Sequence, residues 1–172
     1  MTPDCPAARG GASTVLAFDC AVSGQSVAVV RDGVGVAVGR EEGRDQAARL
    51  LPAIGEILER AGVARQEIDL IAVTTGPGSF TGVRVGLAAA RGLAVGLGVP
   101  LAGVPTTSVL LAQAPPAGRL AGAAVDTHLG DWFCALGEGE ALPFATSTAD
   151  LVARLSGRAC TIVGCDVAPL VA

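Results

Sequence analysis

The 172-residue chain contains no lysine and no tyrosine, so every one of its twelve basic side chains is an arginine. The missing lysine excludes a Walker-type phosphate loop, because that loop carries Gly-Lys-Ser/Thr where it meets its helix. Aromatic residues make up only 3% of the chain, although hydrophobic residues make up 51%. The sequence therefore predicts a core of small aliphatic side chains that approach closely, rather than one of stacked rings.

Side chains that bind metals are also scarce. His128 is the single histidine and no Cys-x-x-Cys pair occurs, so neither a Cys/His zinc site nor any other metal site is expected. An odd number of cysteines cannot all pair within one chain, which favours reduced, mostly buried thiols in the cytoplasm. The five cysteines are Cys5, Cys20, Cys134, Cys160 and Cys165.

Charge and hydropathy limit the surfaces that the chain can bind. A formal net charge of −4 and a pI near 4.9 argue against a phosphate backbone held by this chain alone. Arg84 and Arg91 interrupt the longest apolar stretch, which falls short of the roughly 20 residues that span a bilayer, so no membrane is expected as a partner. Residues 1–13 lack the apolar run of a signal peptide and are predicted to form a disordered tail.

The most informative segment is the motif Thr74–Gly86, with the sequence Thr-Thr-Gly-Pro-Gly-Ser-Phe-Thr-Gly-Val-Arg-Val-Gly. It joins a predicted buried strand, 69–73, to a predicted helix, 80–97, made almost entirely of Ala, Gly, Leu and Val. The part that forms the turn and starts the helix is called the glycine loop below. It consists of Gly76, Pro77, Gly78, Ser79, Phe80, Thr81 and Gly82.

The residue types of the glycine loop suit a tight strand-to-helix connection. Gly76 and Gly78 permit close approaches that a Cβ would forbid, and Pro77 stiffens the turn between them. Ser79 or Thr81 can cap the helix by accepting a hydrogen bond from one of its free amides. A turn of this kind can also bind an anion at the positive end of the helix dipole.

The helix that follows carries small residues at four-residue spacing. Gly82, Gly86, Ala90 and Ala94 lie one above the other and form a smooth stripe. Glycine inside a helix costs up to about 1 kcal/mol relative to alanine, so the stripe calls for a compensating close contact. The residues leave two interpretations open: the stripe packs against the chain's own sheet or first helix, or it packs against a helix of another subunit.

The order of predicted elements indicates two lobes of α/β type, at 14–104 and 105–172. The first reads β-β-β-α-β-α-β, and the second, shorter lobe starts in a similar way. Asp19 and Asp126 close the first strand of each lobe. The predicted strands are 14–19, 25–31, 34–40, 69–73, 101–104, 122–126, 132–136 and 160–163, and the predicted helices are 44–61, 80–97, 106–114 and 147–155.

The duplicated pattern with an acid after the first strand resembles the actin-like ATPase (ribonuclease H-like) superfamily. Within it, the segment Gly76–Gly86 resembles the glycoprotease-like TsaB (YeaZ) family, the dimerisation subunits of the bacterial machinery that makes threonylcarbamoyladenosine in tRNA. The resemblance runs from about Val15 to Gly164. It includes Leu50-Leu51-Pro52, the strand Val99–Val104, Val125-Asp126 and Gly130-Asp131.

The resemblance implies a scaffold rather than an enzyme. The related TsaD subunit transfers the threonylcarbamoyl group to the adenosine next to the anticodon, with a metal held by a His-x-x-x-His pair. Thr106 and Leu110 stand at the matching positions here, and neither is a metal ligand. The resemblance thus implies no catalytic residue and no cofactor on this chain, with ATP entering only at the level of the complex.

The partners implied by the resemblance are a TsaD-type transferase and a TsaE-type ATPase, with tRNA contacted only indirectly. The transferase is expected on the two helices of the first lobe, which favours the intersubunit interpretation of the stripe. A homodimer is also possible, through an apolar face expected near Ile162–Val171. The expected interface residues are Gly82, Arg84, Gly86, Leu87, Ala90, Arg91 and Ala94.

Two other functions remain open from the sequence. One is an active enzyme of the same superfamily, a glycoprotease-like hydrolase or small kinase, although Ser79 has no histidine in its motif. The other is a regulator that binds a nucleotide in a cleft formed by Asp19, Asp126 and the turn at Gly164. The family has Asp-Thr where this chain has Asp19-Cys20, which weakens the case for a nucleotide.

Overall fold

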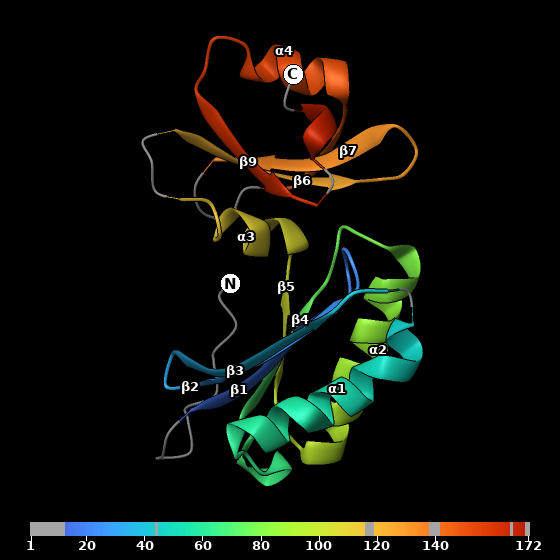
Figure 1. Ribbon diagram of the computed structural model, residues 1–172, viewed down its shortest axis with the longest axis vertical. Coiled ribbons are helices and arrows are strands. Elements are labelled where there is room, and N and C mark those ends of the chain that lie inside the picture. Colours follow the sequence, from blue (N-terminus) through green and yellow to red (C-terminus); the bar gives the residue numbers. More distant parts are fainter. Residues whose placement is uncertain (1–12, 44, 116–118, 138–141, 166, 171–172) are drawn as a thin grey trace.

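The computed structural model describes residues 13–43, 45–115, 119–137, 142–165 and 167–170. It consists of two lobes, each built on one mixed β-sheet, stacked along the long axis of the molecule (Figure 1). The tail predicted for residues 1–13 lies, except for Ser13, outside the described residues.

The first lobe contains a five-stranded sheet in the order β3-β2-β1-β4-β5. Strand β1 pairs antiparallel with β2 and parallel with β4, so the predicted element order is confirmed. The elements are β1 (Thr14–Asp19), β2 (Gln25–Arg31), β3 (Val34–Glu41), α1 (Gln46–Ala61), η1 (Arg65–Glu67), β4 (Leu70–Thr74), α2 (Phe80–Leu97) and β5 (Leu101–Val104).

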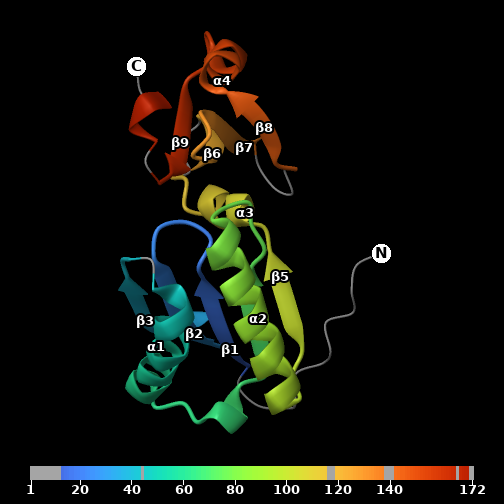
Figure 2. The ribbon, with the colours of Figure 1, turned by 90° about the vertical axis from the view of Figure 1, so that its right-hand side faces the viewer.

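Both long helices pack on the same face of this sheet (Figure 2). Along β1 and β2, buried side chains alternate with half-buried ones, as expected for strands with one covered face. The core is aliphatic with one ring, Phe18, which agrees with the low aromatic content. Each fully buried Val, Leu or Ile contributes about 1.5–3 kcal/mol relative to exposure. Those on α1, β1, β2 and β4 are Leu16, Val27, Val29, Leu50, Ile54, Ile57, Leu58, Ile71 and Val73.

The second lobe repeats the start of the first. Its sheet has the order β8-β7-β6-β9, in which β6 pairs antiparallel with β7 and parallel with β9, as β1 does with β2 and β4. The part of the chain that the structure describes holds no counterpart of α2 and β5 in this lobe. The elements are α3 (Thr106–Leu111), β6 (Leu120–Asp126), β7 (Asp131–Leu136), β8 (Phe144–Ser147), α4 (Thr148–Leu155), β9 (Cys160–Gly164) and η2 (Ala168–Leu170).

The apolar face expected near Ile162–Val171 is largely half-buried where it is described. Ile162, Val167 and Leu170 pack against the cluster around Leu151 and Trp132, so this prediction was wrong for these three residues. The short η2 turn, which contacts α4, provides Leu170, and Val167 lies directly before it. Val171 lies outside the described residues.

The connection between the lobes fixes the glycine loop. Thr75 donates its backbone amide to Val104, and Thr106, at the start of α3, donates its amide to Gly76 at 2.8 Å. Helix α3 packs on the second sheet through Leu110. The loop is therefore tied to the segment that leads from one lobe into the other.

Candidate functional site

The glycine loop lies directly against the turn between β1 and β2. A Cβ added to Gly78 would overlap the carbonyl oxygen of Ala21, and one added to Gly82 would overlap that of Cys20. Only glycine permits the start of α2 to approach this backbone so closely. Gly78 and Gly82 thus allow the start of α2 to pack directly against the turn between β1 and β2.

Two amides of the loop are used within the chain. Ser79 donates its backbone N–H to Ala21 at 2.6 Å, and its hydroxyl accepts the amide of Gly82 at 3.2 Å. Ser79 is therefore the helix cap, one of the two residues predicted for that role. These two donors have partners within the chain, and the anion-binding interpretation of the remaining loop amides stays a prediction.

The small-residue stripe faces the chain's own core. Gly82, Gly86, Ala90 and Ala94 are the buried residues of α2, and a Cβ on Gly86 would contact Val73 and Cys20. The prediction that these four residues meet a partner was wrong, because they let α2 lie close to the sheet. Of the other expected interface residues, Leu87 is half-buried against the core, while Arg84 and Arg91 are exposed.

A second row of residues runs along the opposite side of α2. Phe80, Arg84, Ala88, Gly92 and Gly96 follow each other at four-residue spacing, and all are exposed. A Cβ on either of the two glycines would meet nothing within 4 Å. The exposed surface of small residues that the sequence suggested is therefore formed by Ala88, Gly92 and Gly96, on the side of α2 that faces away from the sheet.

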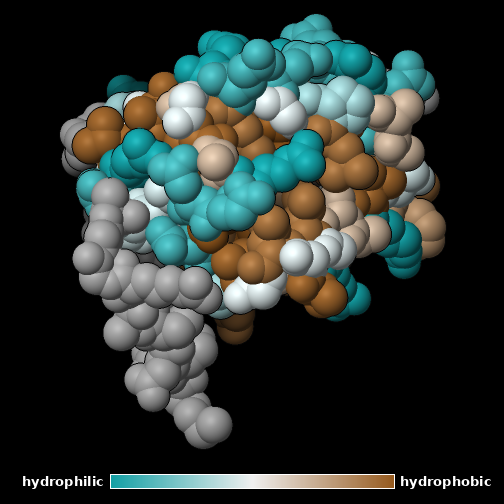
Figure 3. Space-filling model, turned by 90° about the horizontal axis from the view of Figure 1, so that it is seen from below, coloured by the Kyte–Doolittle hydropathy of each residue, from teal (hydrophilic) through white to brown (hydrophobic). Residues whose placement is uncertain are grey.

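Exposed apolar residues of both helices extend this row into a surface, called the outer face below. Val95 is 84% exposed and Leu51 of α1 is 57% exposed. Viewed from below, the lower end of the molecule shows hydrophobic residues divided by a band of hydrophilic ones (Figure 3). The outer face consists of Leu51, Gly55, Phe80, Arg84, Ala88, Gly92, Val95 and Gly96.

One end of the outer face carries an aromatic–cation pair. Phe80 is 72% exposed, and the guanidinium carbon of Arg84 lies 3.3 Å from its ring centroid. Arg84 also donates to the carbonyl oxygen of Phe80 at 3.0 Å, which holds the pair in place. Aromatic and arginine side chains are enriched among residues that dominate protein–protein affinity.

Helix α2 is also the one helix in the described ranges that is long and apolar enough to cross a membrane by length and composition. Its packing is that of a core helix, because its row of small residues lies on β1 and β4. Its two arginines are exposed on the other side.

The two aspartates of the expected nucleotide cleft occupy equivalent positions at the ends of β1 and β6, but each is held by its own lobe. Asp19 accepts hydrogen bonds from the hydroxyl of Thr74 and the amide of Ala21. Asp126 accepts the amide of His128 at 2.7 Å, and His128 Nδ1 lies 3.3 Å from its other oxygen. These contacts give both carboxylates a structural role at a strand end.

No metal-binding cluster of three or more His, Cys, Asp or Glu side chains is present in the described ranges. Thr106 and Leu110, at the positions of the metal-binding pair of TsaD, are both buried in α3.

The buried thiol beside the glycine loop is expected to be unreactive. Burial, with a smaller effect from the Asp19 carboxylate, raises the pKa of Cys20 to about 12 from an ordinary value of 9.0. A shift of three pKa units lowers the thiolate fraction at pH 8 about a thousand-fold. A thiol reagent should label the half-buried Cys160 and Cys165 before Cys20, with sites read by peptide mapping. Rapid labelling of Cys20 in the folded chain would contradict the packing described above.

Comparisons with known proteins agree with this architecture. A family model described as TsaD, tRNA N6-adenosine threonylcarbamoyltransferase, matches residues 19–128, so the chain is related to that transferase family. The Escherichia coli tRNA threonylcarbamoyladenosine biosynthesis protein TsaB is 38% identical over 126 residues, which are 70% of this chain and 53% of that protein.

Two solved structures share the fold. YeaZ from Pseudomonas aeruginosa superimposes with a TM-score of 0.64 at 33% identity, covering 78% of this chain and 64% of that one. An uncharacterised protein similar to peptidase YeaZ from Pseudomonas aeruginosa gives a TM-score of 0.69 at 27% identity, covering 92% and 90%.

The chain belongs to the TsaB (YeaZ) family, and it shares its fold with YeaZ. It spans about half the length of the curated TsaB relatives that it matches.

Proposed function

We propose that the chain is a non-catalytic scaffold that binds and activates a TsaD-type transferase in the N6-threonylcarbamoylation of tRNA adenosine. In this proposal the transferase docks on the outer face, and a TsaE-type ATPase and ATP join at the level of the complex. The tRNA is contacted only indirectly, as the net charge of −4 suggests.

The observation that carries the proposal is the outer face itself. Two neighbouring helices present glycine and alanine where another helix pair can approach closely, flanked by large exposed apolar side chains. Soluble monomers rarely leave a contiguous apolar surface of this kind uncovered. The exposed arginines Arg84 and Arg91 lie on the same side of α2, where guanidinium groups can pair with partner carboxylates.

The proposal is tested by reconstitution with the TsaD-type subunit of the same genome. The two chains should co-elute in gel filtration, and the chain should stimulate threonylcarbamoyl transfer to tRNA while transferring nothing alone. Transfer or hydrolysis by the isolated chain would favour the alternative of a hydrolase or kinase. Tight ATP binding by the isolated chain in calorimetry would favour the nucleotide-binding regulator.

A further inference from the structure

The turn between β1 and β2, residues 20–24, contributes to both lobes and is called the linking turn below. It lies at the end of the first sheet that faces the second lobe (Figure 1 and Figure 2). Cys20 is buried in the core of the first lobe, whereas Val22 packs against the cluster of the second lobe that contains Val125. Among the described residues of that cluster, Val22 is the only one that comes from the first lobe.

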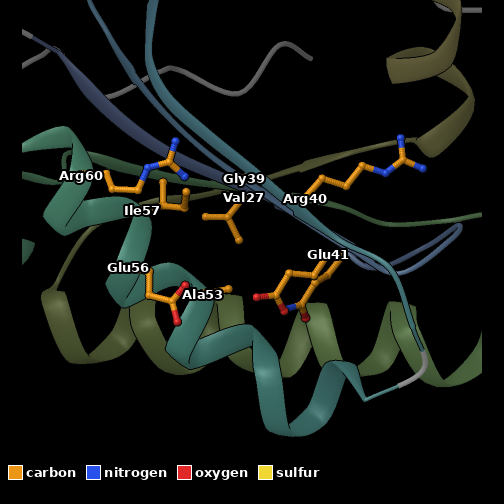
Figure 4. Close-up of a pocket in the computed structure, with 9 residues that line it drawn as sticks. Val27, Gly39, Arg40, Glu41, Ala53, Glu56, Ile57 and Arg60 are labelled. Atoms are coloured by element: carbon orange, nitrogen blue, oxygen red, sulfur yellow. The ribbon is translucent and has the colours of Figure 1, made fainter.

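Ser23 adds a polar contact to each lobe. Its hydroxyl oxygen accepts a hydrogen bond from Arg40 of β3 at 3.0 Å, and it lies 3.6 Å from the sulfur of Cys165, directly after β9. In the cavity of about 140 Å³ between α1, β2 and β3, Arg40 points away from Glu41 and Glu56, which agrees with this contact (Figure 4). Ser23 thus connects an edge strand of the first sheet to the end of a strand of the second.

The backbone of the linking turn is held by three elements of the first lobe. The glycine loop, at the start of α2, lies against its first two carbonyl groups, and Gln46 of α1 donates to the carbonyl oxygen of Gly24 at 3.3 Å. A Cβ added to Gly24 would overlap the backbone of Glu41 on β3. The linking turn therefore cannot move without moving the first lobe.

The linking turn is a second connection between the lobes, beside the covalent one. Within the described residues the chain crosses between the lobes once, from Val104 of β5 through Pro105 to Thr106 of α3. One crossing alone would let the lobes rotate about it as about a hinge. The linking turn begins at β1, two strands away from β5 in the sheet. Because neighbouring strands lie about 4.8 Å apart, this second contact lies roughly 10 Å from the crossing and restrains that rotation.

We infer that the linking turn holds the two lobes in one orientation, with Val22 packed against the core of the second lobe and Ser23 in contact with Cys165. Separation of the lobes would expose Val22 to water and break the contact of Ser23. The start of α2 lies on the same turn, so the second lobe is also fixed relative to the outer face. The inference concerns the chain alone, and its failure would leave the scaffold proposal intact.

The test uses the full chain with Ser23→Cys, in which the new thiol and that of Cys165 can form a disulfide between the lobes. Cys5, outside the described residues, is replaced by serine. Equilibration with reduced and oxidised glutathione gives the effective concentration of the two thiols for each other. Flexibly tethered groups reach roughly millimolar values, so a pair held in contact should exceed them at least about tenfold. A value in the millimolar range would overturn the inference.

Substitutions of Val22 in the same background provide a second readout. Val22→Asp should lower the effective concentration at least about tenfold, because it places an unpaired carboxylate in an apolar cluster. Val22→Ala, which introduces no charge, should lower it about threefold or more through lost apolar contact. The matched control is Val38→Asp, at a position that is 65% exposed on β3, and it should leave the value unchanged. Val22 variants that behave like Val38→Asp would contradict the inference.

A further control separates a fixed contact from chance encounters between thiols. Ser23→Cys combined with Cys165→Ser leaves Cys160, at the other end of β9, as the half-buried thiol of the second lobe. No disulfide between the lobes is expected in this variant, and peptide mapping identifies any that forms. Equal oxidation of the two variants would show that the lobes move past one another freely, against the inference.

Discussion

Replacing Ala90 with glutamate should unfold the first lobe. Ala90 is fully buried in the row of α2 that packs against the sheet, so the longer side chain has no room and its carboxylate has no partner. Overpacking costs about 1–3 kcal/mol and an unpaired buried charge costs several more. The sum approaches the 5–15 kcal/mol that stabilises a typical domain. Urea unfolding followed by circular dichroism measures the effect.

The matched control is Ala88→Glu on the same helix. Ala88 is exposed, so the same change there should alter the free energy of unfolding by no more than about 0.5 kcal/mol. Equal stability of the two variants would mean that the stripe around Ala90 faces solvent, and the assignment of the two sides of α2 would have to be reversed.

Replacing Gly92 with leucine should have opposite effects on stability and on assembly. Gly92 lies in an open helical position, so leucine should stabilise the isolated chain by about 0.5–1 kcal/mol through helix propensity. The same side chain would hold a partner helix away from α2. Loss of a central contact costs about 2 kcal/mol or more, which corresponds to at least about 30-fold weaker binding of the TsaD-type subunit. Thermal unfolding and surface plasmon resonance measure the two effects.

The control for this prediction is Gly35→Leu on β3. A Cβ there also meets nothing within 4 Å, but β3 is the edge strand of the sheet, and Gly35 lies outside the outer face. Its affinity for the TsaD-type subunit should match that of the unaltered chain. If Gly92→Leu binds as tightly as Gly35→Leu, the outer face is not the docking site.

Much of the first lobe could be predicted from local patterns. The order of elements along the chain, a cap at Ser79 or Thr81 and the extent of α2 follow from periodicity and turn chemistry, and the structure has this order, this helix and the cap at Ser79. These features depend on residues that are neighbours in the sequence, so a single sequence is sufficient to predict them.

The side of α2 that meets the core could not be predicted, because the helix has small residues in two rows. Gly82, Gly86 and Ala90 in one row match Ala88, Gly92 and Gly96 in the other in size and spacing. The difference comes from Cys20 and Ala21, which are distant in sequence and approach the helix only in the folded lobe. The glycine at position 82, beside the cap, was the one available indication of this close approach.

Other features that the sequence did not predict also depend on residues that are distant along the chain. Strand β8, Phe144–Ser147, was not among the predicted strands, because its four residues are recognisable as a strand only through their pairing with β7. The cavity between α1 and β3 depends on the side-by-side placement of Gln25 and Glu41, which β-pairing brings together. The internal repeat was predicted, but the closure of the second core by Val167 and Leu170 was not.

Because α2 carries only Gly and Ala in the row that lies on the sheet and only Ala88, Gly92 and Gly96 along the middle of the opposite row, the helix would act as a thin partition between the sheet and a docked partner. A methyl group gained on one side would strain the fold, and one gained on the other would loosen the assembly. Substitutions along this segment are therefore constrained twice over, which would keep Ala and Gly abundant there even where the rest of the surface diverges.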